Sequence, residues 1–209
     1  IDRETLFQQV EALHKAGYQL AIHGNGDQAI EDILDAFEAA QQAHPVDDPR
    51  MILIHAQMAR EDQVARMRQL GVTPSFFTAH TFYWGDRHRD MFMGPERAAV
   101  ISPSRWALDH GVRFSSHLDT PVTPMLPLQA VWSQVHRLTY GGDVLGPEQR
   151  IEVMGALRAV TIDAAWQVFQ EDNRGSLEPG KYADLVVLSG NPLDDPIAMR
   201  ELIVERTVI

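Results

Sequence analysis

Short apolar runs of strand length alternate along this chain with helical patterns, and this alternation restricts the fold more than any other feature. Four runs have the length and composition of buried strands: Tyr18–His23, Met51–His55, Gly71–Ser75 and Gly111–Ser116. Strands that are separated by helices lie parallel and are joined by right-handed crossovers. The alternation therefore predicts an α/β fold, and it fits both a doubly wound sheet and a (β/α)₈ barrel.

Amphipathic spacing and punctuation residues place the helices. Asp27 can cap the helix that follows the first strand, and Ser102-Pro103 suits a cap followed by a first turn. The expected helices lie before Gly17, from Asp27 to Gln42, from Arg60 to Leu70, after Ser102-Pro103, and from points near Leu126, Pro147 and Asp163. A complete barrel needs eight strands and typically about 250 residues, so only part of a barrel fits this chain.

Composition excludes several classes of function. The 209 residues carry 18 basic and 29 acidic side chains, a formal net charge of −11, so a phosphate-binding surface and hence a nucleic-acid partner are not expected. No run of about eighteen apolar residues occurs, and we expect no membrane span. The chain has no cysteine, which leaves nine histidines and the carboxylates as candidate metal ligands.

Three expected strands end in, or run directly into, a residue that can bind a metal ion. These residues are His23, His55 and Asp119. In an α/β barrel the carboxyl ends of the strands form the active-site face, so the three would converge there. Two imidazoles and a carboxylate suit a divalent ion such as zinc. The alternative is that each histidine is an ordinary hydrogen-bonded residue of the core or of a loop.

Two neighbouring features leave alternatives open. His117, two residues before Asp119, is either a substrate contact or a solvated loop residue. The segment "HGNGD" after the first strand lacks the later glycine of the G-x-G-x-x-G phosphate loop, which argues against a doubly wound nucleotide-binding domain. A long loop is expected over residues 76–97, and its aromatic residues, Trp84 among them, either form an apolar wall for substrate or pack the loop onto the barrel.

Six ordered segments carry a resemblance to a known family: "HGNGDQAI", "IHAQ", "GVTPSFFTAHTFYWGD", "GPERA", "SHLDTPVTPMLPLQAVW" and "GSLEPGKYADLVVL". Together they resemble the amidohydrolase superfamily, and most closely its family 3 branch, which includes N-substituted formamide deformylase. The resemblance implies that His23 and His55 bind metal at the ends of the fifth and sixth barrel strands. It implies that Asp119 contacts the metal and handles the proton of the attacking water, and that His80 faces the substrate.

The family's first-strand His-x-His pair and its fourth-strand ligand have no counterpart here. The chain thus resembles the second half of a (β/α)₈ TIM-type barrel over residues 1–172, followed by the C-terminal part of a small β-sandwich over residues 173–209. In that family the sandwich is built from both ends of the chain. This explains why a strand, Ala183–Leu188, begins so close to the C-terminus.

The implied function is metal-dependent hydrolysis. The resemblance suggests that a small-molecule substrate with an amide, formamide or cyclic amide C–N bond is cleaved by metal-activated water, with zinc as the expected metal and one or two ions bound. His80, Trp84 and His117 are the candidate substrate contacts. We expect this piece alone to be inactive, and a cytoplasmic location. The competing interpretation is a non-catalytic half barrel that serves as a binding or regulatory module.

Four strands without further neighbours would leave two exposed edges. The outer strands would be Tyr18–His23 and Gly111–Ser116, whose outward N–H and C=O groups need partners. Apolar side chains such as Leu20, Ile22 and Phe114 are also expected to lose part of their cover. Both features favour pairing with a second copy, so self-association is predicted.

Overall fold

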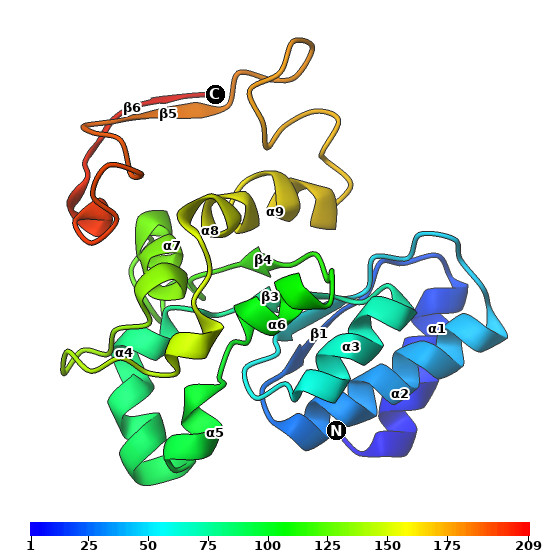
Figure 1. Ribbon diagram of the computed structural model, residues 1–209. Coiled ribbons are helices and arrows are strands. Elements are labelled where there is room, and N and C mark those ends of the chain that lie inside the picture. The colour runs from blue at the N-terminus through cyan, green and yellow to red at the C-terminus, as the bar shows by residue number, and fades with distance from the viewer.

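The four strands form a single parallel sheet in chain order. The computed structural model describes all residues 1–209 (Figure 1). The sheet order is β1-β2-β3-β4, with every pair parallel. The strands are β1 Ala21–Gly24, β2 Ile52–His55, β3 Thr73–Phe76 and β4 Ser115–Ser116. The predicted α/β fold is confirmed, although β4 is shorter than the predicted Gly111–Ser116.

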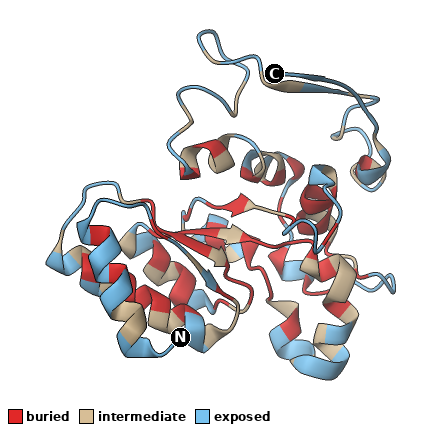
Figure 2. Cartoon of the chain, turned by 180° about the vertical axis from the view of Figure 1, so that it is seen from behind, coloured by how far each residue is buried: buried red, intermediate tan, exposed pale blue.

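Helices connect the strands and cover the sheet, as the alternation predicted. Figure 1 shows α1, α2 and α3 side by side, and α8 and α9 beside β4. The helices of this layer are α1 Arg3–Lys15, α2 Asp27–Ala43, α3 Glu61–Leu70, α6 Ser104–Asp109, α7 Pro127–His136, α8 Val153–Ala159 and α9 Ile162–Gln167, with a 3₁₀ turn at Pro147–Gln149. Their inward faces and the strands carry the buried residues (Figure 2). Leu34, Phe37 and Leu53 are among the fully buried members of this core.

Two predicted helix caps differ from the structure. The α2 helix begins at Asp27 itself, with Gly26 as the residue before it, so Asp27 does not occupy the cap position. Its carboxylate instead lies 3.3 Å from the Arg97 guanidinium. The α6 helix begins at Ser104, after Pro103, while the Ser102 hydroxyl donates to the Phe77 carbonyl. Tertiary contacts therefore use both side chains that local sequence rules assigned to capping.

The segment predicted as a long loop is mostly helical. It contains α4 (His80–Arg87), a five-residue π-helix (His88–Phe92) and α5 (Pro95–Ala99). Close packing supports α4, because a Cβ atom on Gly85 would lie 2.8 Å from Thr139. Glycine and aromatic residues have weak helix propensity, so the local sequence does not predict α4. Its packing against distant residues stabilises it instead.

The C-terminal region forms a separate two-stranded antiparallel sheet. Strands β5 (Leu185–Leu188) and β6 (Val204–Val208) pair with each other and lie apart from the main sheet, beyond α8 and α9 (Figure 1). A 3₁₀ turn at Met199–Glu201 connects this region to the rest, and Met199 is fully buried in the main core. The predicted β unit near the C-terminus is therefore present and anchored.

The two outer strands of the main sheet are the ones that the sequence predicted, but the apolar side chains on them are not exposed as expected. Strands β1 and β4 are the outer strands. Leu20 is only 6% exposed and Phe114 only 3%, so the prediction that they lose cover is wrong for both; Ile22 is half-buried. The helices of this chain are sufficient to bury them. No helix of the structure has the length and apolar character that crossing a membrane requires.

Candidate metal centre

The carboxyl edge of the sheet brings three candidate ligands together. His55, the last residue of β2, lies with His117 and Asp119 so that one potential ligand atom from each is within 4.8 Å of the others. His23 in β1 packs edge-on against His55, with ring centroids 4.6 Å apart. The predicted residues His23, His55 and Asp119 thus lie near one another at the carboxyl edge of the sheet. The three residues whose ligand atoms are mutually within reach are His55, His117 and Asp119, and His23 packs beside them.

Unusual backbone conformations aim two of these residues. His55 has φ 70° and Asp119 has φ 53°, both in the left-handed region. Residues other than glycine rarely adopt this region, and such strain concentrates at functional sites. Asp119 is exposed, with its loop stiffened by Pro121 and Pro124, whereas His55 is buried. The chain therefore places a buried imidazole and an accessible carboxylate at the same edge.

The imidazoles of the cluster are held in their neutral form. Burial lowers the pKa of His55, the nearby His23 lowers it further, and Asp119 opposes both. Burial also lowers the pKa of His117 to about 4, with His55 adding to the effect. Neutral imidazole is the form that binds metal. Two neutral imidazoles and a carboxylate within reach of one point fit a divalent ion such as zinc.

His117 is not a solvated loop residue. Its Nε2 lies 3.0 Å from Nδ1 of His55, and its Nδ1 lies 2.9 Å from the Ser75 hydroxyl. Its ring also stacks on Phe77 with centroids 5.4 Å apart. Both ring nitrogens are therefore engaged within the protein, which excludes one of the two alternatives that the sequence left open.

An aromatic wall adjoins the cluster on the α4 side. The His80 ring stacks parallel to His55 at 6.5 Å, with Phe77 at 4.1 Å and Trp84 at 5.0 Å. Burial, and then the neighbouring His88, His55 and His117, lower the pKa of His80 to about 3. His80 and Trp84 thus lie together near the candidate ligands. Phe82, from the same predicted wall, instead packs on Trp132 at 5.6 Å.

Two polar residues of the site were not predicted as site residues. Gln57 Nε2 lies 3.1 Å from Nε2 of His88, which begins the π-helix. Burial lowers the pKa of His88, and its Nδ1 is buried without a partner in the protein. Their contact joins segments 31 positions apart, so no local pattern predicts it. The only signal in the sequence is that each lies near a candidate site residue, Gln57 two positions after His55 and His88 eight positions after His80.

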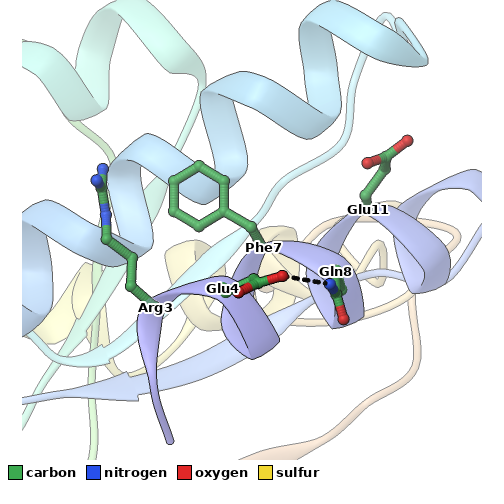
Figure 3. A pocket seen from close by; sticks show the side chains of 5 residues that line it. All are labelled: Arg3, Glu4, Phe7, Gln8 and Glu11. Atoms are coloured by element: carbon green, nitrogen blue, oxygen red, sulfur yellow. Dashed lines mark hydrogen bonds between the residues drawn. The ribbon is translucent and has the colours of Figure 1, made fainter.

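Two surface hollows lie away from the histidines. A hollow of about 460 Å³ on α1 is lined by Arg3, Glu4, Phe7, Gln8 and Glu11 (Figure 3). The Arg3 guanidinium stacks on the Phe7 ring at 4.9 Å. A second hollow, of about 440 Å³, is lined by Phe82, Trp132 and Arg200 among others, and the Arg200 guanidinium stacks on the Trp132 ring at 4.5 Å. Neither includes a candidate ligand, so the strand ends remain the candidate site.

Comparison with known proteins gives consistent similarities. The family model described as "Amidohydrolase family" matches residues 1–209. N-substituted formamide deformylase from Arthrobacter pascens is 36% identical over 93% of this chain and 36% of its own length. Protein LONG AFTER FAR-RED 3 from Arabidopsis thaliana is 34% identical over 93% of this chain and 34% of its own length. This chain spans about a third of the length of both relatives.

Two solved structures have a fold similar to that of this chain. An uncharacterized metal-dependent hydrolase from Pyrococcus horikoshii OT3 matches with a TM-score of 0.77 and 25% identity, over 92% of this chain and 38% of that one. A metal-dependent hydrolase from Pyrococcus furiosus, also described as uncharacterized, matches with a TM-score of 0.74 and 24% identity over the same shares. The latter likeness bears on the fold alone.

Proposed function

Because the chain belongs to the amidohydrolase family, we propose that it provides part of the active site of a metal-dependent hydrolase that cleaves a C–N bond by metal-activated water. The observation that carries the proposal is the convergence of His55, His117 and Asp119 at the carboxyl edge of the sheet, with His23 against His55. The preferred substrates are amides, formamides or cyclic amides. The similarity to a formamide deformylase supports this class.

In this proposal His23, His55 and Asp119 hold the ion, and zinc is the preferred metal. His117 is not one of the proposed ligands, because both of its ring nitrogens already contact Ser75 and His55. When bound, the ion would lower the pKa of a bound water toward about 7 and polarise the substrate carbonyl. His55 meets the requirement for a neutral ligand because burial lowers its pKa. His23 is exposed beside it, where its ring can turn toward a shared ligand position.

Asp119 is the proposed catalytic residue. As an exposed carboxylate beside the imidazoles, it can accept a proton from the attacking water and then return it to the leaving nitrogen. Its backbone is left-handed, and its carboxylate lies within 4.8 Å of the potential ligand atoms of His55 and His117. The neutral His80 can hydrogen-bond a polar atom of the substrate, and Trp84 offers an apolar surface next to it.

Metal binding and turnover test this function directly. Calorimetric titration of the chain with zinc is expected to show binding that His55→Gln abolishes. In assays on N-substituted formamides and simple amides, any hydrolysis is expected to be slow, to require metal and to be lost in Asp119→Asn. The sequence contains no His-x-His pair, so we expect weak binding and slow or absent turnover by the 209 residues alone. Hydrolysis that persists in chelator or in Asp119→Asn would contradict the proposal.

A further inference from the structure

Helix α4 presents two faces with different partners. His80 and Trp84 are four positions apart and therefore lie on one face, where their ring centroids are 5.0 Å apart. Phe82 lies between them in the sequence, so the helical period places it on the opposite face. There its ring packs edge-on against Trp132 of α7 at 5.6 Å and against Tyr140 at 5.7 Å. A shift of Phe82 therefore moves the helical turn that carries both candidate substrate contacts.

The guanidinium of Arg200 covers this opposite face. It lies 5.2 Å from the centre of the Phe82 ring and 4.5 Å from that of Trp132. Both distances fall within the about 6 Å over which the face of an aromatic ring attracts a cation. The two rings are the partners that the structure gives this guanidinium, which forms no ion pair. Its charge therefore acts on the outer face of α4.

The segment that carries Arg200 is held in place by contacts that do not involve this side chain. We call residues 196–201 the C-terminal strap. Trp132 Nε1 donates a hydrogen bond to the Ile197 carbonyl over 2.9 Å. Met199 is fully buried in the main core. The strap therefore stays docked when the Arg200 side chain is changed, and a fixed backbone sets the position of the guanidinium.

Helix α4 needs outer contacts of this kind to keep its orientation. Its helix propensity is weak, and it runs directly into the π-helix His88–Phe92. Phe82 and Arg200 both line the hollow of about 440 Å³ beside α7. A ring at the border of a hollow has room to move when one of its contacts is lost. Arg200 is therefore placed to limit the movement of Phe82.

We propose that Arg200 is a positioning residue of the candidate site, which holds α4 in its orientation through Phe82. The two substrate contacts proposed on α4, His80 and Trp84, then keep their place beside His55. The strap leads into β6, so this contact also connects the small C-terminal sheet to the site. The consequence for substrate rests on the proposed function, but the orientation of α4 is a property of the metal-free chain.

Nuclear magnetic resonance of the metal-free chain in chelator measures this orientation. The indole ¹H–¹⁵N signal of Trp84 and the ring protons of His80, assigned with Trp84→Phe and His80→Gln, report on the inner face of α4. In Arg200→Ala we expect these signals to shift and the α4 amides to exchange about 2–5-fold faster, the factor that an exposed cation–π contact supplies. The Leu202 amide, which donates to the Met199 carbonyl, should keep its exchange rate because the strap stays docked.

Three matched variants separate the charge of Arg200 from its packing. Arg200→Lys keeps a cation on a long stem and should restore most of the wild-type Trp84 signal. Arg200→Met keeps an apolar stem without the charge and should not restore it. Arg206→Ala removes an exposed arginine of β6 and should change nothing on α4. Unchanged Trp84 and His80 signals in Arg200→Ala, or equal restoration by Lys and Met, would overturn the proposal.

Titration with N-phenylformamide connects the orientation to substrate binding. With zinc present, this formamide should shift the wild-type Trp84 signal, and Arg200→Ala should need about 2–5-fold more of it for the same shift. Equal affinity in the two chains would remove Arg200 from the site. A wild-type chain that does not bind the formamide, with variant signals that still behave as expected, would instead count against the proposed function and leave the positioning role standing.

Discussion

Replacing His80 with glutamine should remove about 2 kcal/mol of the acid-induced loss of stability. His80 has an ordinary pKa of 6.5, which burial and neighbouring histidines lower to about 3 in the folded chain. The unfolded chain therefore takes up a proton at this position first as the pH falls. The stabilising contribution of the neutral ring is complete above pH 6.5 and is lost progressively as the pH falls toward 3.

The magnitude follows from the difference in protonation at a chosen pH. A pH of 5 lies about 1.5 units below the ordinary pKa of His80, so the ring is almost fully protonated in the unfolded chain, whereas it is almost entirely neutral in the folded chain, where the pKa is about 3. Each unit corresponds to about 1.36 kcal/mol, so the wild-type chain loses about 2 kcal/mol through this residue between pH 7.5 and pH 5. A glutamine cannot titrate and contributes no such loss.

Urea unfolding in chelator at pH 7.5 and pH 5 measures this difference. The quantity compared is the change in the free energy of unfolding between the two pH values, so a uniform destabilisation of His80→Gln does not affect it. His110→Gln is the matched histidine-to-glutamine control, because His110 contacts Glu61 and lies outside the cluster of buried histidines. Equal losses in wild type and His80→Gln would refute the argument that burial keeps His80 neutral.

Three further predictions use other features of the structure. Gly146→Ala should lower the free energy of unfolding in urea by more than about 4 kcal/mol, because its Cβ would lie 1.6 Å from the Ala99 carbonyl oxygen. Gly71 is also left-handed but has open space around it, so Gly71→Ala should cost only about 1–2 kcal/mol, and equal costs would count against the close contact. Asp119→Asn should weaken zinc binding by more than the roughly 10–100-fold that an outer-shell partner costs, with the melting temperature little changed; calorimetry and thermal unfolding measure the two, and unchanged affinity would exclude Asp119 as a ligand. We also propose that the chain self-associates through the free edges of β1 and β4; light scattering over a range of concentrations should show a species larger than a monomer, and a monomer at every concentration would show that these edges are protected locally.

Local patterns were sufficient to predict the arrangement of the sheet and the proximity of two candidate ligands. A buried run followed by a helical pattern specifies a parallel strand, and parallel strands end at the same edge. His55 closes such a run, and His23 lies one residue before the end of β1. Their proximity therefore required no knowledge of the packing. Asp119 was also a candidate because it follows the fourth run, and the resemblance to a family added its proposed catalytic role and added His80, whose position local periodicity does not specify.

The tertiary structure decided what depends on contacts between distant segments. Residues 80–87 form a helix because their neighbours pack closely around them, although their own helix propensity is weak. Leu20 and Phe114 are buried in the core, and no local sequence pattern predicts which side chains at the sheet edges are covered. The bond of His117 to Ser75 joins residues 42 positions apart, and it changes His117 from a surface candidate into an oriented ring. Periodicity records which face of an element is apolar, but the partner of each polar atom is determined only when the elements pack together.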